Sequence, residues 1–564
     1  MSLPLTSNAM LMILSPVPLI VALLLVPTPT AQAQGDFKII RVGKYLPQQI
    51  EAFESHGSHL GIAAYTVGNT LCNITNHSLR WSPGTGQDHP VFVSNAYRLK
   101  GRRFEQIGQS WGVHPFCALC MSICAGQGPD GCAQDLRAYC SEGLSVALAD
   151  GMKGGPRFTV LPTVGDHIHP DPNPMGSPIT RGRLQIAVND VRPGLNLGAK
   201  YWAESLGIHF EDHSAGGARN NVAWREVEFL ANATNELVGA TPESHEAEPA
   251  LYGWKQEDPA VRIQAVVNTD EGGPGVHGYY DVASRAWDNG DGSWDYTYVV
   301  YNQNSGQGAS ALEIPSQAGV QLTNTWFHDV DYHSGEPQDG TDWGMTQSAS
   351  SIRFACTETH AQNIDANAIN WGTAYSFGFT ADAGPSSSTG LIELFEPGVG
   401  TILTFALEGP NLMPPPVGTT YCFGTTNCPC SGSAGPDEGC ANTGGSGAKL
   451  VGTGIASLAA DTVRLHISGV PGNKPGVLLR GNNQVTLATG DGLLCVGGAT
   501  MRSQLQVTNA GSTVFNHFSG GGFATVSNPV GVPTNFQFWY RDSGNPCSGS
   551  GFNFANGIEI VYVP

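Results

Sequence analysis

The sequence predicts a mainly β protein, with immunoglobulin-like or jelly-roll sandwiches in tandem preceded by an irregular, disulfide-stapled region. Three observations support this fold class. Short β-favouring runs follow one another, and no helical period of useful length lies between them. The 73 glycines and 37 prolines supply turns, while charged residues make up only 13% of the 564 residues. Thirteen cysteines indicate disulfides.

Residues 1–33 are expected to form a signal peptide. The segment from Ala9 to Val26 is mostly apolar, and Ala31-Gln32-Ala33 provides an A-x-A cleavage site, so the mature chain should begin near Gln34 or Gly35. Pro16 and Pro18 interrupt the apolar run and argue against a stable membrane span. We therefore expect a secreted or cell-surface protein without a transmembrane segment in the mature chain.

The formal net charge is −20, and no run of Lys or Arg offers a local exception. Such a chain repels phosphate backbones, so no nucleic acid is expected as a partner.

The region 34–252 is expected to be irregular. It holds six cysteines (Cys72, Cys117, Cys120, Cys124, Cys132 and Cys140), and short helices are suggested at 132–148 and 201–206. Together with Cys356 these cysteines form an odd set, so one thiol is free or pairs between chains. The spacing Cys117-x2-Cys120-x3-Cys124 could alternatively hold zinc.

The region 253–407 is expected to form a sandwich. Residues 278–287 and 295–305 are β-favouring runs joined by "DNGDGSW", whose Asn-Gly and Asp-Gly pairs favour a hairpin turn. Further strands are expected at 320–332, 350–356, 374–382 and 389–398.

Residues 408–420 are expected to be a proline-rich linker, because Pro414 to Pro416 form a stiff spacer. Residues 421–564 follow as a second sandwich module, with strands at 462–470, 476–483, 503–509, 536–542 and 558–563. The module holds an even set of six cysteines: Cys422, Cys428, Cys430, Cys440, Cys495 and Cys547.

Three stretches of this module, "YCFGTTNCPC", "GCANTGGSGAKL" and "NFQFWYRDSGNPC…GFNFANGIEIVY", resemble a C-terminal module found on many large exported bacterial proteins of unknown function. The resemblance implies a structural, sorting or surface-display appendage and implies no chemistry. The stretches "YTVGNTLCNI" and "RLKGRRFEQIGQSW", with the sandwich region, resemble the N-terminal portion of uncharacterised exported bacterial proteins without an established activity.

The usual catalytic strings G-x-S-x-G, H-E-x-x-H and G-x-x-x-x-G-K-[ST] are absent from the sequence. Fourteen of the sixteen histidines precede the linker, and the candidate clusters contain His89, His114, His167, His169, His209 and His213. His167 and His169 would point the same way on an extended segment and could share a metal.

The densest group of polar residues is "FHDVDYHSGEPQDGTDW", from Phe327 to Trp343. If residues 325–333 form a strand, Asp329 and Asp331 lie on one face and repel one another unless a cation, a proton or water offsets the repulsion. Asp339 and Asp342 add oxygen ligands of the kind that calcium prefers. We therefore expect calcium as a cofactor held by these four aspartates. A transition-metal or acid/base site, or a polar loop without a ligand, are the alternatives.

The aromatic residues favour a binding role. Phe536, Phe538 and Tyr540 should face the core of the last module, which leaves Trp539 beside Arg541 either buried between sheets or exposed as a platform for sugars. The leading hypothesis is an exported extracellular protein with a structural or binding role, whose partners are extracellular polysaccharide or cell-envelope components. The alternative is a metal-dependent hydrolase acting on extracellular polymer, so the sequence leaves open whether the protein is an enzyme.

Overall fold

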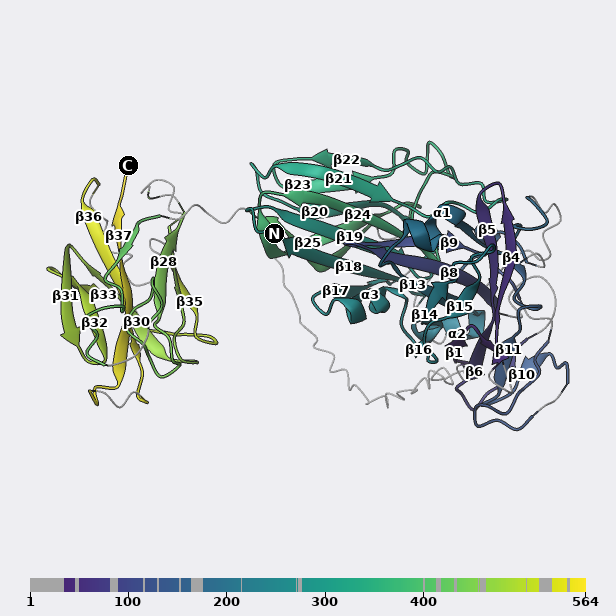
Figure 1. Ribbon diagram of the computed structural model, residues 1–564, viewed down its shortest axis with the longest axis horizontal. Helices are drawn as coiled ribbons and strands as arrows, with labels where there is room; N and C mark the ends of the chain where they lie inside the picture. Colours follow the sequence, from purple (N-terminus) through teal and green to yellow (C-terminus); the bar gives the residue numbers. More distant parts are fainter. Residues whose placement is uncertain are drawn as a thin grey trace, which may run out of the picture.

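The computed structural model describes residues 35–45, 50–81, 90–114, 117–128, 131–151, 154–163, 176–214, 216–269, 271, 276–398, 401–411, 417–430, 434–454, 456, 463–503, 505–516, 530–544 and 548–563. Predictions made for residues 1–33, His89, His167, His169, Pro414 to Pro416 and Cys547 lie outside these ranges. The described chain is mainly β, in several antiparallel sheets along the sequence (Figure 1), which confirms the predicted fold class.

The first region, residues 35–257, is built on a nine-stranded antiparallel sheet in the order β15-β14-β13-β8-β9-β12-β5-β4, with β16 also paired to β14. Its strands are β4 (Phe53–His59), β5 (Ile62–Val67), β8 (Val91–Lys100), β9 (Arg103–Gln109), β12 (Leu184–Ala187), β13 (Lys200–Ile208), β14 (Val222–Phe229), β15 (Leu237–Gly239) and β16 (His245–Glu246).

A smaller sheet covers one face of the nine-stranded sheet. It contains β1 (Phe37–Val42), β6 (Asn69–Asn73) and β11 (Ser141–Leu144), beside the short pairs β2 (Lys44–Tyr45) with β3 (Ile50–Glu51) and β7 (Leu79–Arg80) with β10 (Asp135–Leu136). The helices are α1 (Val188–Val191), α2 (Phe210–Ser214) and α3 (Leu251–Glu257), with 3-10 turns η2 (Arg157–Thr159), η3 (Pro193–Leu195) and η4 (Ala218–Asn220).

The two short helices suggested by the sequence at 132–148 and 201–206 are wrong. The first segment contains β10 and β11, and the second lies in β13. In β13, Tyr201 and Ala203 face one hydrophobic cluster and Trp202 faces another. Because both faces of this central strand are buried, it lacks the apolar–polar alternation by which a strand is recognised.

Three disulfides staple the first region: Cys72–Cys124, Cys117–Cys132 and Cys120–Cys140. The zinc alternative for Cys117, Cys120 and Cys124 is therefore wrong, since each of these sulfurs is bonded to another cysteine. Cys356 is the free thiol that the odd count required.

The second region is a sandwich of two five-stranded sheets, in the orders β17-β18-β19-β24-β21 and β22-β23-β20-β25-β26. The strands are β17 (Arg262–Asn268), β18 (Gly278–Asp288), β19 (Trp294–Asn302), β20 (Ala309–Pro315), β21 (Leu322–His328), β22 (Gly344–Gln347), β23 (Ser351–Ala355), β24 (Thr373–Ala381), β25 (Gly384–Leu394) and β26 (Ile402–Asn411).

The predicted hairpin is confirmed as β18 and β19. Gly290 and Gly292 in its turn have positive φ angles of 78° and 92°, which glycine adopts without strain. The strand expected over 325–333 instead ends at His328, and the chain beyond it leaves the sheet.

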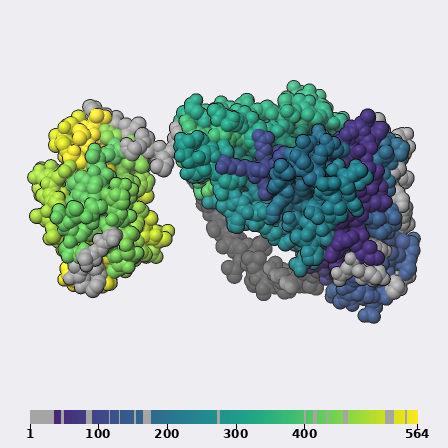
Figure 2. Space-filling model, in the orientation of Figure 1, coloured from purple at the N-terminus to yellow at the C-terminus, as the bar shows by residue number. Residues whose placement is uncertain are grey.

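The first region and the sandwich share a hydrophobic cluster, to which Trp202 and Trp254 contribute from one side and Val299 and Tyr301 from the other. We call the whole boundary between the first region and the sandwich the seam. Figure 2 shows the two regions as one continuous surface across it. The turn between β8 and β9 also reaches the sandwich, because the Arg103 guanidinium carbon lies 4.1 Å from the ring centroid of Trp326. These two regions therefore form one packed body.

The last module has a main sheet in the order β27-β37-β36-β30-β33, with β34 paired to β30, and the smaller sheets β28-β29-β35 and β31-β32. The strands are β27 (Thr419–Tyr421), β28 (Lys449–Thr453), β29 (Arg464–Ser468), β30 (Pro475–Gly481), β31 (Asn483–Thr489), β32 (Gly492–Gly497), β33 (Met501–Arg502), β34 (Gln506–Val507), β35 (Thr513–Asn516), β36 (Pro533–Arg541) and β37 (Phe552–Val561).

Phe536, Phe538 and Tyr540 are fully buried in the core of this module, as the pleat of β36 predicts. Two disulfides, Cys422–Cys495 and Cys428–Cys440, lie at its edge, and Cys430 is disulfide-bonded as well.

A candidate binding pocket at the seam

The loop that follows β21, residues 329–343, joins the sandwich to the first region. The His328 ring, at the end of β21, is hydrogen-bonded to the Gln106 carbonyl oxygen at 3.0 Å. Farther along, the Trp111 indole donates to the Ser334 carbonyl oxygen at 3.1 Å. This polar loop therefore connects the two regions through hydrogen bonds between residues more than 200 positions apart in the sequence.

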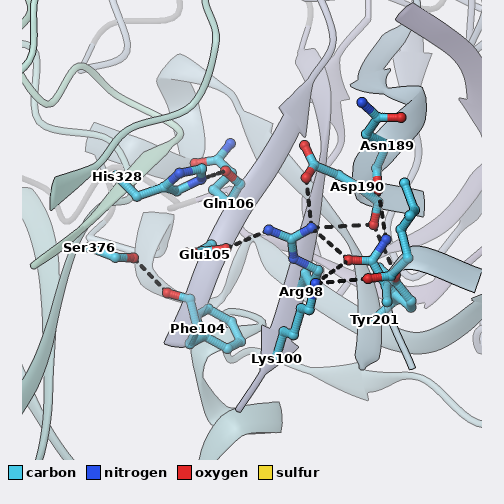
Figure 3. A network of polar contacts seen from close by, with 12 residues as sticks. Arg98, Lys100, Phe104, Glu105, Gln106, Asn189, Asp190, Tyr201, His328 and Ser376 are labelled. Carbon is cyan, nitrogen blue, oxygen red and sulfur yellow. Dashed lines mark hydrogen bonds and ion pairs between the residues drawn. The ribbon is translucent and has the colours of Figure 1, made fainter. Parts of the chain in front are cut away.

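Strand β9 is held on both of its sides (Figure 3). On one side the sandwich reaches it through His328 and through the Ser376 hydroxyl, which donates to the Phe104 carbonyl oxygen at 2.6 Å. On the other side Arg98 pairs with Glu105 at 2.7 Å and with Asp190 at 2.6 Å. Because contacts hold β9 from both sides, its backbone has a fixed position at the seam.

His333 is buried and connects the loop to the first region. Its Nε2 lies 2.9 Å from the Arg183 carbonyl oxygen, and its ring packs against Trp111 with 5.3 Å between centroids. The neutral ring can donate from Nε2 to that carbonyl oxygen and accept the Ser334 hydroxyl at Nδ1, 3.3 Å away. Burial lowers the pKa of His333 to about 4, so the ring is neutral at physiological pH.

Glu336 fastens the loop to the segment that begins η2. Its two carboxylate oxygens accept the backbone N–H groups of Arg157 at 2.7 Å and of Phe158 at 3.1 Å. Burial raises the pKa of Glu336 to about 7, although these two hydrogen bonds act in the opposite direction. A carboxyl group that exchanges its proton near neutral pH therefore lies at the seam.

The Arg157 guanidinium is wholly engaged by the protein. It donates to the carbonyl oxygens of Ser94, Ser110 and Gly372 and to Oδ1 of Asn95, at distances from 2.6 to 3.0 Å. Burial lowers the pKa of Arg157 to about 10, which still leaves it charged at neutral pH. Arg157 thus holds backbone from both regions together.

Asn95 links Arg157 to a second buried charge. Its amide nitrogen donates to Glu204 at 2.9 Å, and the same Glu204 oxygen accepts the hydroxyls of Tyr97 at 2.9 Å and Tyr301 at 3.1 Å. Burial raises the pKa of Glu204. Neither of these buried charges is left without partners, as a dry interior requires.

A cavity of about 1140 Å³ opens over this seam. The aromatic residues in its lining are Phe158, Tyr332, Trp371 and Phe395, and the amide side chains are Gln109, Gln307, Gln338 and Asn370. Phe158 is 51% exposed, whereas Trp371 is 5% exposed and its indole donates to the Arg157 carbonyl oxygen at 3.2 Å. We call this cavity the seam pocket; Trp371 forms a fixed wall and Phe158 an accessible one.

Four carboxylates belong to the lining: Glu271, Glu336, Asp365 and Glu396. Glu271 accepts the Ser305 hydroxyl at 2.7 Å and the Gln307 backbone N–H at 2.9 Å, and burial raises its pKa. The arrangement can bind a ligand with both an apolar face and hydrogen-bonding groups.

Of the four aspartates predicted to hold calcium, Asp329 and Asp342 lie close enough that burial and, to a lesser extent, the charge of Asp342 raise the pKa of Asp329. Asp329 accepts the Asn367 amide at 2.5 Å, and Asp339 accepts the Asn363 amide at 3.1 Å. Asp331 and Asp342 are exposed. In the part of the chain that the structure describes, no group of three or more His, Cys, Asp or Glu side chains is placed to hold a metal ion. Calcium binding stays a prediction, which calorimetry with calcium can decide.

The described histidines among those suggested by the sequence make separate contacts. His114 is buried, the His209 ring lies 2.9 Å from the Arg80 carbonyl oxygen, and His213 Nδ1 lies 3.3 Å from the Asn304 amide. In the last module, Trp539 is half-buried, with the Arg541 guanidinium 5.5 Å from its ring centroid.

The sequence did not predict the seam pocket. Phe158 and Arg157 lie in "PRFTVLPT", which has neither a motif nor an unusual composition. Of the pocket lining, Tyr332, Glu336 and Gln338 belong to the polar stretch from Phe327 to Trp343. A local signal is absent because the pocket forms where segments far apart in the chain meet.

No family model matches the sequence, and no curated protein matches it. Among solved structures, a serine-rich repeat adhesion glycoprotein of Streptococcus agalactiae is 8% identical, with 61% of this chain and 88% of that chain covered and a TM-score of 0.16. An α2-macroglobulin of Escherichia coli, activated by porcine elastase, is 8% identical, with 94% and 41% covered and a TM-score of 0.11. The chain thus spans under half of the latter, and neither likeness carries an argument.

The fold and the pocket define a class: a disulfide-containing, multidomain β-sandwich protein with a large pocket between two packed β regions. None of the helices in the described ranges has the length and apolar character that crossing a bilayer requires.

Proposed function

We propose that this is an extracellular binding protein whose seam pocket holds a segment of an extracellular polysaccharide. The observation that carries the proposal is the lining of the seam pocket, which combines aromatic side chains with amide and carboxylate groups. Sugars offer an apolar ring face to an aromatic side chain and hydroxyls to amides and carboxylates.

The size of the seam pocket supports a polymer over a small metabolite. Pockets for drug-sized ligands measure about 300–1,000 Å³, and the seam pocket has about 1140 Å³. The five disulfides with both partners described support an extracytoplasmic site of action, because such bonds persist in oxidising compartments.

Calorimetry with a panel of soluble oligosaccharides tests the proposal. Phe158→Ala should weaken binding of the recognised oligosaccharide about tenfold, which corresponds to about 1.4 kcal/mol. Its melting temperature should stay close to that of the wild type, because half of the ring is already exposed. Tyr139→Ala is the matched control, since Tyr139 is 44% exposed and lies outside the pocket lining. Equal affinities for the wild type and Phe158→Ala would place the ligand elsewhere.

A further inference from the structure

The charges in the seam pocket are unequal. Its lining contains the carboxylates of Glu271, Glu336, Asp365 and Glu396, against the guanidinium of Arg157 and the imidazole of His360. The Arg157 guanidinium donates to three carbonyl oxygens and Asn95, and it keeps its positive charge, which acts on Glu336. The His360 ring packs edge-on against Phe395, 5.2 Å between centroids. A ligand in the pocket therefore meets more negative than positive charge.

The hydrogen bonds to the carboxylates of Glu336 and Glu271 come from neutral donors. Glu336 accepts backbone N–H groups, and Glu271 accepts the Ser305 hydroxyl, the Asn268 amide and the Gln307 N–H. The Glu396 carbonyl oxygen accepts the Gln307 amide at 3.0 Å, but among the described residues no side chain donates to the carboxylates of Asp365 and Glu396. Within those same residues, no Lys or Arg lies within ion-pair distance of any of the four carboxylates.

Such a set of carboxylates favours a cationic ligand over an anionic one. Burial raises the pKa of both Glu336 and Glu271, because charged carboxylates are costly where water is scarce. A positive charge brought by a ligand would offset that cost, whereas a uronic acid or a sulfate would add to it. Glu396 is exposed and Asp365 is half-buried, so both are within reach of an entering ligand.

Building on the proposed function, we infer that the seam pocket selects polysaccharides with free amino groups over neutral and anionic ones. The exposed ring of Phe158 contacts a sugar face, and an ammonium group on the sugar pairs with Asp365 and Glu396 at the rim. The chemistry that is recognised is thus an amino sugar with its amine unacylated.

The test compares two probes that differ only at the amine. A β-1,4-linked tetramer of glucosamine and its fully N-acetylated counterpart are titrated into the full chain by calorimetry at pH 6 and low salt. The free amine should bind at least tenfold more tightly, and added salt should reduce the preference because it screens the ion pairs. The double variant Asp365→Asn, Glu396→Gln should bind both tetramers alike.

Glu358→Gln is the matched control, since Glu358 is an exposed carboxylate outside the pocket lining, and it should keep the preference. If both tetramers bind the wild type equally, the inference is wrong while the proposed function stands. If neither tetramer nor any member of the oligosaccharide panel binds, the proposed function itself fails. If tetralysine binds and the sugars do not, the pocket takes a basic peptide and both proposals are overturned.

Discussion

The carboxylate of Glu336 accepts the backbone N–H of Arg157 at 2.7 Å and thereby ties the loop after β21 to the segment that lines the seam pocket. Burial raises the pKa of Glu336 from 4.5 to about 7, against the effect of this hydrogen bond, and so makes stability depend on pH. Over that interval the folded chain binds more protons than the unfolded chain. The contribution of Glu336 is therefore fully present below about pH 4.5 and is lost as pH rises through about 7.

Glu336→Gln should flatten this dependence. Urea unfolding at pH 5 and pH 8 should show a smaller difference in the free energy of unfolding for the variant than for the wild type. Glu142, whose pKa burial also raises to about 7, is untouched in the variant and should preserve part of the slope. An unchanged slope in Glu336→Gln would show that this carboxyl is not protonated at the seam.

His333 should make the seam sensitive to acid. Because its pKa is lowered from 6.5 to about 4 by burial, its contribution to stability is fully present above about pH 6.5 and is lost as pH falls through about 4. His333→Gln keeps a donor for the Arg183 carbonyl oxygen and does not titrate, so its acid transition should move to lower pH. Hydrogen exchange of residues 332–336 between pH 4 and 7, corrected for the intrinsic exchange rate at each pH, measures this, and equal protection at both ends would contradict it.

The buried carboxyl group of Asp212 lies beside the half-buried Asp36 at the start of β1. Burial, followed by the hydrogen bond and charge of Asp36, raises the pKa of Asp212, so Asp212 favours the fold at low pH and loses that contribution as pH rises. Asp212→Asn keeps an acceptor for the Phe37 N–H. Asn221, whose Oδ1 has no partner among the described residues, can turn its amide to accept from the new side chain.

The Asp212→Asn variant should gain stability relative to the wild type as pH rises from 5 to 8.5, measured by urea midpoints. Asp135→Asn is the control, since Asp135 is exposed in the same region. A variant that is destabilised equally at both pH values would show that the pKa of Asp212 is not raised in the folded chain.

The last module should fold by itself. Residues 417–564 contain a complete core and the disulfides Cys422–Cys495 and Cys428–Cys440, so this segment made under oxidising conditions should unfold cooperatively in circular dichroism. Opening the Cys422–Cys495 bridge by a Cys→Ser pair should cost about 4 kcal/mol, because the bridge closes a long loop. A segment that remains disordered while the full chain folds would disprove its independence.

Local pattern was sufficient for part of this architecture. The turn glycines Gly290 and Gly292 predicted the β18–β19 hairpin, and alternation in 536–540 predicted which rings are buried. Alternation gave no signal in β13, where both faces are covered. It also gave no warning that the chain leaves the sheet after His328, because the contacts that draw it away are made with Gln106, Trp111 and Arg183.

The pocket could not be predicted from local sequence patterns, because it too depends on contacts between distant segments. Phe158 lines the pocket on a backbone whose N–H is held by the carboxylate of Glu336, far along the chain. The density of carboxylates predicted a cation, and this stays a prediction, because density in sequence does not set the distance between side chains.

The turn between β8 and β9 places the Arg103 guanidinium on the face of Trp326, and Arg102 lies 5.4 Å from the ring centroid of Trp287. Each of these tryptophans belongs to the sandwich, and each arginine belongs to the first region. The two regions should therefore be inherited together, since recombination between them would remove Arg103 from Trp326 and Arg102 from Trp287. Trp287 would keep Arg285, whose guanidinium lies 5.0 Å from its ring centroid. Recombination between genes should therefore be tolerated at the boundary near residue 417 and not at the boundary near residue 257.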